Sequence, residues 1–314
     1  MTQMNLNHAE IRAAIRELID NKTITGAALA RETGQSTAAV SQYLNEKYKG
    51  DNDAVAASLQ TWLETRNSVQ NTLPVIPDYV VTPTSEKITA ALTYAQLTHT
   101  IALVYGHPGV GKSQVVKHYA RTGNNVWCIT ASKSRTNELE TMYELALAMG
   151  ISDAPYQRGA LSRLLRHRLR DTSALIVIDE ADWLNYDAIE ELRILQEECS
   201  IGLAFVGNHK VYDRLTGGTR SVDFARLFSR VAKKVVINNV LAGDVDAFCD
   251  AWNVTGRDER NLLKAIAKRP GALRSLSHIL PLASIYASGM TLTCEHIHAA
   301  MIELGHAAIE GDAA

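Results

Sequence analysis

An apolar run passes directly into a glycine-rich loop in the stretch Ile101-Ala102-Leu103-Val104-Tyr105-Gly106-His107-Pro108-Gly109-Val110-Gly111-Lys112-Ser113. The loop has the spacing G-x-x-x-x-G-K-[ST], in which glycines let successive backbone N–H groups point inward at phosphate oxygens. A helix that begins near Lys112 would add its positive N-terminal end. The stretch therefore predicts a strand, a phosphate-binding loop and a helix that together bind ATP.

Within this stretch, the Lys112 ammonium is expected to reach the β- and γ-phosphates, and the Ser113 hydroxyl is expected to ligate Mg²⁺. The predicted nucleotide-binding residues of the loop are Gly106, His107, Pro108, Gly109, Val110, Gly111, Lys112, Ser113 and Gln114.

A second apolar run, residues 175 to 178, ends in the acidic residues Asp179 and Glu180. A continuous apolar run of this length is typical of a parallel strand that is buried on both faces. We expect Asp179 to hold Mg²⁺ with Ser113, and Glu180 to orient and deprotonate the attacking water. An alternative is that the acids only cap a helix that starts at Asp182 or Asn185. Beside a phosphate loop, the two acids predict hydrolysis of ATP as well as binding.

The length, composition and net charge of the chain limit the class of protein to which it can belong. A chain of 314 residues is long enough for two to three structural units, and its hydrophobic content of 46% is that of a globular protein. A net charge of −2 means that any contact with nucleic acid must come from local basic clusters. The four cysteines are scattered, which argues against a zinc site or a disulfide framework. With neither a secretion signal nor a long apolar run, the chain is expected in the cytosol, without a membrane partner.

Residues 1 to 70 have the apolar spacing of helices. Thr25 is expected to cap a short helix and Ser36 or Thr37 a second one, with Gly34 in the turn, which is typical of a helix-turn-helix. The candidates for contact with the DNA major groove are Gln35, Thr37 and Gln42. The second helix has no Arg or Lys, so a helical bundle that contacts protein stays open as the alternative.

The rest of the chain is predicted to contain a linker, an α/β core and a helical lid. Residues 71 to 84 hold three of the seven prolines and are the predicted linker. Residues 85 to 240 alternate helices with strands, which implies a parallel sheet with flanking helices. The strands are expected at Ile101–Tyr105, Val126–Thr130, Leu175–Asp179, Gly202–Val206 and Lys234–Asn238. Residues 241 to 314 have a helical pattern and form the predicted lid.

Three further positions are candidates for roles in hydrolysis. Asn208 follows the fourth strand and is expected to hold the attacking water, and the alternative is that Gly207-Asn208 is a simple turn at the end of the strand. Arg230, or as second choice Arg226, is expected to project onto the γ-phosphate bound by a neighbouring subunit. Arg274 is expected to reach the nucleotide of its own subunit, and a structural salt bridge is the alternative.

Two stretches and one loop are locally basic. The candidates for contact with DNA phosphates are Lys133, Arg135, Arg163, Arg166 and Arg220. Arginines spread around a helix are equally consistent with a solvated face, so both interpretations stay open.

Over about residues 85 to 305 this set of motifs resembles the AAA+ ATPases, with an α/β P-loop core and an all-α lid. Within them it is similar to the ATPases that select target DNA for transposable phages. The blocks that carry this likeness are 44–52, 107–113, 124–127, 175–182, 207–209, 224–230 and 270–274. The resemblance implies a protein that assembles as an oligomer or filament on double-stranded DNA when ATP is bound, with little sequence specificity. It also implies that this protein delivers the DNA to a DDE transposase and stimulates strand transfer.

Two other functions are compatible with the motifs. One is a nucleotide-switched transcription regulator or prophage repressor, in which the helix-turn-helix recognises an operator. The other is an initiator-like loader of a helicase. A regulator should prefer one duplex by about 10³ or more, whereas a target selector should bind random duplex with a steep salt dependence.

Overall fold

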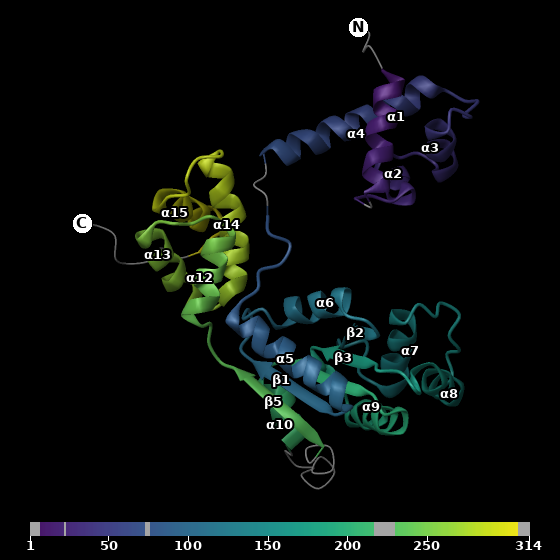
Figure 1. Ribbon diagram of the computed structural model, residues 1–314, viewed down its shortest axis with the longest axis vertical. Coiled ribbons are helices and arrows are strands. Elements are labelled where there is room, and N and C mark those ends of the chain that lie inside the picture. The colour runs from purple at the N-terminus through teal and green to yellow at the C-terminus, as the bar shows by residue number, and fades with distance from the viewer. Residues whose placement is uncertain (1–6, 22, 73–75, 217–229, 307–314) are drawn as a thin grey trace. The chain divides into compact units, whose positions relative to one another are not determined.

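The computed structural model describes residues 7–21, 23–72, 76–216 and 230–306, and the chain divides into two compact units, residues 1–75 and 76–314 (Figure 1). None of the helices in these ranges combines the length and the apolar character that crossing a membrane would need.

In the described residues of the first unit there are four helices, α1 (His8–Asp20), α2 (Gly26–Glu32), α3 (Thr37–Leu44) and α4 (Asn52–Thr72). Their core contains Ile15, Leu29, Tyr43 and Leu59. The Thr25 side chain accepts a hydrogen bond from the first turn of α2, and Ser36 does the same for α3. Between them Gly34 has φ +68°, so the two predicted capped helices and their turn are confirmed. That this pair forms a helix-turn-helix that binds DNA stays a prediction.

The segment between α4 and α5 is shorter than the predicted linker, residues 71 to 84, and part of it is held by contacts with the rest of the protein. Helix α4 continues to Thr72 and α5 (Pro83–Thr98) already begins at Pro83. In between, the Tyr79 ring stacks on His118 with ring centroids 3.7 Å apart, and Asp78 pairs with Arg121 at 2.6 Å. Both partners lie on α6 (Lys112–Thr122), so residues 76–82, which we call the strap, pack against α6 within the second unit.

The second unit is built on a five-stranded sheet in the order β2-β3-β4-β1-β5. Its strands are β1 (Ile101–Gly106), β2 (Val126–Thr130), β3 (Leu175–Asp179), β4 (Gly202–Gly207) and β5 (Val231–Ile237). All neighbouring strands are parallel, which confirms the predicted parallel sheet. Strand β5 starts at Val231, earlier than predicted.

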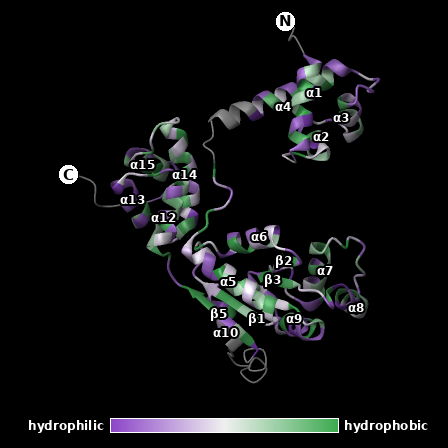
Figure 2. Ribbon diagram, in the orientation of Figure 1, coloured by the Kyte–Doolittle hydropathy of each residue, from purple (hydrophilic) through white to green (hydrophobic). Residues whose placement is uncertain are grey.

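Helices cover both faces of this sheet. Helices α5 and α6 pack on one face through Ile88, Leu92 and Val116. The helices on the other face are α7 (Glu138–Ala148), α8 (Arg158–Leu169), α9 (Tyr186–Cys199) and α10 (His209–Thr216). The central strands are therefore apolar on both sides (Figure 2). Their carboxyl ends share one edge of the sheet, where the glycine-rich loop, the acids and Asn208 follow.

The C-terminal helices have a core of their own, which confirms the predicted helical lid region. They are α12 (Ala242–Ala251), α13 (Arg257–Ala267), α14 (Ala272–Ala287) and α15 (Cys294–Glu303). The fully buried Asp244 side chain connects α12 to α5, because it accepts hydrogen bonds from the Thr84 N–H at 2.8 Å and the Thr84 hydroxyl at 2.7 Å.

Candidate nucleotide-binding site

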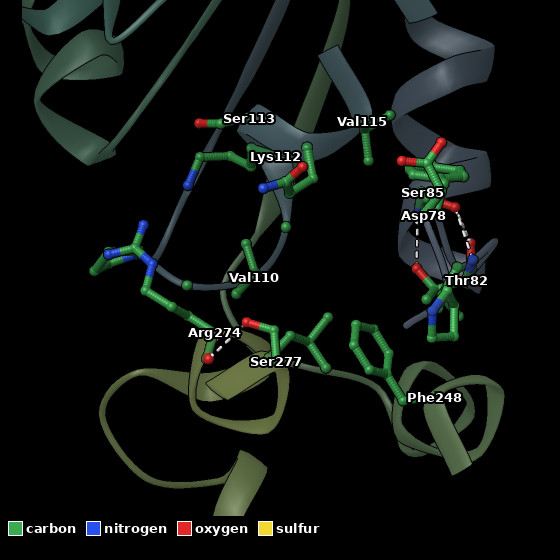
Figure 3. A pocket seen from close by; sticks show the side chains of 18 of the residues that line it. Asp78, Thr82, Ser85, Val110, Lys112, Ser113, Val115, Phe248, Arg274 and Ser277 are labelled. Carbon is green, nitrogen blue, oxygen red and sulfur yellow. Dashed lines mark hydrogen bonds between the residues drawn. The ribbon is translucent and has the colours of Figure 1, made fainter. Parts of the chain in front are cut away.

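A cavity of about 460 Å³ lies at the carboxyl edge of the sheet, between the glycine-rich loop, the strap and the lid (Figure 3). Its lining includes the loop residues 108–115, Glu180, Asn208, the strap residues 76–80, and Phe248, Trp252, Leu273, Arg274 and Ser277 of the lid. The structure thus brings together, at one cavity, predicted site residues that are far apart in the sequence.

Lys112 is at the start of α6 and only 9% exposed. Its Nζ donates hydrogen bonds to the carbonyls of Gly106 at 3.0 Å and His107 at 2.7 Å. Burial lowers the pKa of the Lys112 ammonium, and the nearby carboxylates, Glu180 foremost, oppose that shift. In Figure 3 Lys112 and Ser113 lie on the same side of the cavity as Arg274. Gly106 and His107, two of the predicted nucleotide-binding residues, hold the Lys112 ammonium through their backbone carbonyl oxygens.

The glycine-rich loop touches the lid directly at Gly109. This residue has φ +83°, and a Cβ there would lie 2.2 Å from the carbonyl oxygen of Gly271. The Gly109 carbonyl accepts a hydrogen bond from the Arg274 N–H at 3.2 Å. A glycine is required here both by the backbone conformation and by the close approach of the lid. This contact places Arg274 in the cavity, as the sequence predicts.

Of the two predicted acids, Asp179 ends strand β3 and Glu180 directly follows it. Asp179 is buried and accepts a hydrogen bond from the Glu180 N–H at 3.0 Å. Glu180 has left-handed backbone geometry, with φ 52°, and its side chain lines the cavity. Burial raises the pKa of the Glu180 carboxyl, and the charges of Asp179 and Asp182 raise it further. Such a carboxylate is a stronger proton acceptor than an exposed one.

Asn208 lines the cavity from the end of β4. Its side-chain N–H donates to the Asp182 carboxylate at 3.0 Å, and its side-chain oxygen accepts from the Lys210 N–H at 2.8 Å. Asp182 is not among the predicted site residues. The only sequence signal for it is its place as the last acid of the run Asp179-Glu180-Ala181-Asp182.

Sequence reasoning also missed the apolar end of the cavity. Phe248 and Trp252 line it from α12 and the residue after it, and Tyr79 lines it from the strap. The spacing of four between Phe248 and Trp252 puts both rings on one helix face, which is the signal that the sequence offered. Figure 3 shows Phe248 beside Asp78 and Thr82, on the side of the cavity away from Lys112.

Arg230, the first choice for a role at the nucleotide of a neighbouring subunit, lies away from the cavity. Arg230 directly precedes β5, at the amino edge of the sheet, whereas the cavity lies at the carboxyl edge. Its guanidinium pairs with Glu197 on α9 at 2.9 Å. Arg226 and Arg220 lie outside the described residues. Within one chain, the structure therefore does not bring Arg230 to the cavity.

The candidates for DNA contact differ in whether their side chains are exposed or form ion pairs with acidic residues of the protein. Lys133 is exposed, with its Nζ 5.7 Å from the centre of the Trp183 ring, and Arg163 is exposed on α8. Arg135 pairs with Glu144 at 3.2 Å. Arg166 pairs with Glu191 at 3.5 Å and also with Glu198, so its guanidinium is neutralised by the protein itself.

In the first unit, the three predicted groove-contacting residues also differ. Thr37 and Gln42 are exposed on α3. Gln35 precedes that helix and its amide donates to the Ser58 hydroxyl of α4 at 3.2 Å. Gln35 thus contacts a neighbouring helix of its own unit.

Comparison with known proteins identifies the family. Residues 95–215 match the family described as AAA domain, and residues 229–304 match the family described as Mu B transposition protein, C terminal. The chain is 48% identical to the ATP-dependent target DNA activator B of Escherichia phage Mu over 284 residues, which cover 90% of this chain and 91% of that protein. The chain belongs to the Mu B transposition protein family.

Another Mu B family protein is the Mu-like prophage FluMu DNA transposition protein B of Haemophilus influenzae. It is 42% identical over 265 residues, which cover 84% of this chain and 92% of the relative. Among solved structures, the ORC2 protein of Aeropyrum pernix, in ADPNP and ADP complexes, matches with a TM-score of 0.50 at 15% identity. The match covers 75% of this chain and 72% of that one. At this identity the likeness concerns the fold alone. This Mu B family chain is an ATPase with an AAA+ core.

Proposed function

We propose that this chain binds ATP with Mg²⁺ in the cavity, hydrolyses it, and in its ATP-bound form activates target DNA for transposition. One observation carries the proposal. A cavity lined by a phosphate loop, by Glu180, which directly follows the buried Asp179, and by a lid arginine occurs in a chain that is 48% identical, over nearly its whole length, to a target DNA activator.

The roles of the cavity residues follow from charge and position. The loop N–H groups and the Lys112 ammonium bind the β- and γ-phosphates, and Arg274 neutralises charge from the lid side. Glu180 accepts the proton of the attacking water, which the Asn208 side chain helps to hold. The nucleotide base takes the apolar end, beside Phe248 and Trp252.

Ser113 and Asp179 fit the proposed Mg²⁺ site. A hydroxyl and a carboxylate are hard oxygen donors, and Mg²⁺ is usually held by one or two carboxylates together with substrate phosphates. Held by these two residues, Mg²⁺ would neutralise the negative charge that develops on the phosphates during hydrolysis. Ser113 follows the phosphate-binding lysine, and Asp179 ends the strand that also positions Glu180.

Assembly on DNA forms the second half of the proposal. We propose that subunits associate on double-stranded DNA into an ATP-dependent oligomer or filament in the cytoplasm of a bacterial host, and deliver that DNA to a DDE transposase. Arg230, or Arg226, would act on the γ-phosphate of the adjacent subunit, because Arg230 lies at the edge of the sheet opposite to its own cavity. The exposed Lys133 and Arg163 are the proposed phosphate contacts.

The DNA half is tested by fluorescence anisotropy on random-sequence duplex with ATP, ADP or no nucleotide, across a salt series. We expect cooperative binding with ATP alone and a steep loss of affinity with salt. The logarithm of the association constant should fall by about 0.9 per unit of log salt concentration for each phosphate that is neutralised. Removing Lys133 or Arg163 should lower that slope by about one each. Weak binding that is indifferent to nucleotide, or a preference of about 10³ for one duplex, would instead favour the regulator.

The hydrolysis half is tested with Glu180→Gln. The variant should bind ATP normally and hydrolyse it about 10²- to 10⁴-fold more slowly, the contribution of a general base. Its DNA-bound assembly should therefore persist. Normal hydrolysis by Glu180→Gln would remove the proposed base. Arg230→Ala should impair hydrolysis only in assemblies, and an equal loss in the monomer would exclude a role in trans.

A further inference from the structure

Asp182 is a buried carboxylate to which the proposed mechanism gives no role. It is 7% exposed and lies in η1, the 3₁₀ turn Ala181–Trp183 that directly follows Glu180. The turn is closed by hydrogen bonds from the Trp183 N–H to the Glu180 carbonyl at 3.0 Å and from the Leu184 N–H to the Ala181 carbonyl at 3.2 Å. The position of Asp182 is therefore fixed relative to Glu180.

The Asp182 carboxylate connects the segment after β3 to the end of β4 through its contacts with Asn208. One carboxylate oxygen accepts the Asn208 side-chain N–H at 3.0 Å, and the other lies 3.5 Å from the Asn208 backbone nitrogen. A side chain at Gly207 would prevent this approach, because a Cβ there would lie 2.8 Å from Asp182 Oδ1 and 2.3 Å from Val211 Cγ2. Burying a carboxylate is costly unless such donors satisfy it, so the site is built around this pair.

Together, Asp182 and Lys210 determine which way the Asn208 amide faces. The amide oxygen accepts from the Lys210 N–H at 2.8 Å while the amide nitrogen donates to Asp182. Rotating the amide by half a turn would set its oxygen against the carboxylate and its N–H₂ against the Lys210 N–H. Both contacts would then be repulsive. In the observed orientation the nitrogen keeps a second N–H, and Asn208 lines the cavity.

We propose that Asp182 is a positioning residue for ATP hydrolysis. It holds the Asn208 amide so that an N–H donor serves the γ-phosphate and the attacking water, and it ties that amide to the turn that carries Glu180. The inference rests on the proposed roles of Glu180 and Asn208. Substituting Asp182 should have little effect on nucleotide binding. The proposed phosphate ligands, Lys112 and the loop N–H groups, belong to other elements.

The first test compares Asp182→Asn with Asp187→Asn in steady-state ATPase assays on the full chain. An amide at position 182 can pair with the Asn208 amide in either orientation, so only the Lys210 N–H still favours the observed orientation and the preference is weakened. We expect kcat to fall about 10- to 100-fold, as for other supporting residues around a reacting centre, with the KM for ATP changed less than about threefold. Asp187 is an exposed acid in the first turn of α9, so Asp187→Asn makes the same chemical change without this effect.

The second test is a double-mutant cycle with Asp182→Ala and Asn208→Ala. If Asp182 acts through Asn208, the double variant hydrolyses ATP at the rate of Asn208→Ala alone. Fully additive losses, or a wild-type kcat in Asp182→Asn while Asn208→Ala is impaired, would overturn the inference and leave the proposed function intact. If Asn208→Ala itself hydrolyses normally, the proposed role of Asn208 fails and the inference fails with it. Thermal melting and ATP binding of each variant separate these outcomes from loss of the fold.

Discussion

The two ends of the cavity are built in different ways. The phosphate end consists of consecutive loop residues, 108–113, with Glu180 and Asn208 from neighbouring strand ends. The apolar end, which we define as Tyr79, Phe248 and Trp252, is assembled from the strap and the lid. At the first end, the groups that meet a ligand are backbone N–H groups and buried charges. At the second, they are aromatic side chains.

This difference predicts how each end responds to change. A buried charge or a backbone conformation has no substitute nearby, so losing it should abolish function. Aromatic contact is spread over several side chains, and each adds only part of the total. The comparison therefore predicts large effects at the phosphate end and graded effects at the apolar end.

The largest effect is expected for Lys112→Ala. It removes the buried ammonium that the loop carbonyls and Glu180 hold at the phosphate end. ATP binding should weaken by about 100-fold or more, which corresponds to about 3 kcal/mol of charge-assisted contacts. Isothermal titration calorimetry measures the effect. Lys117→Ala, which removes an exposed lysine of the same helix, should bind ATP like the wild type. Equal affinities for the two variants would remove the distinction between the ends.

The same difference explains what the sequence could predict. The glycine-rich loop of the phosphate end was predictable because its residues are contiguous and their spacing is a property of the local backbone. The central strands were predictable because they are buried on both faces and thus continuously apolar. Strand β5 was predicted too short, because it lies at the edge of the sheet and exposes Lys233 and Lys234. Those lysines interrupt the apolar run that would mark the start of the strand.

The apolar end was not predictable, because its side chains meet only through the fold. Prolines near Tyr79 indicated a linker, and nothing local shows that its ring stacks on His118. The partnership of Asp182 with Asn208 is equally non-local, since 26 positions separate them. In both cases the sequence shows the residue types, whereas the pairing depends on how strands and helices are packed.

A smaller effect is expected for Trp252→Ala at the apolar end. Losing one large aromatic contact should weaken ATP and ADP binding equally, by about tenfold, because a contact of this kind contributes about 1.5 kcal/mol. The kcat at saturating ATP should change little, since the ring is remote from Glu180 in the proposed arrangement. Tyr94→Ala is the matched control, because that ring is exposed on α5. A loss for ATP alone would show instead that Trp252 acts at the phosphates.

The smallest effect is expected for Arg121→Gln, which breaks the ion pair between α6 and the strap. Both side chains are largely exposed, at 60% for Arg121 and 78% for Asp78, although their contact is only 2.6 Å. The hydrogen bond from Arg121 lowers the pKa of the Asp78 carboxyl, so the pair is fully formed at neutral pH and is lost only as the pH falls through that lowered value.

Solvent screens such a pair, so the affinity for ATP should fall by about twofold at low salt and not at all at about 1 M salt. His118→Ala should weaken binding more than Arg121→Gln, because it removes the ring on which Tyr79 stacks. The reverse order would mean that charge, and not aromatic contact, places the strap. The apolar end would then be held in the same way as the phosphate end, and the proposed difference between them would be wrong.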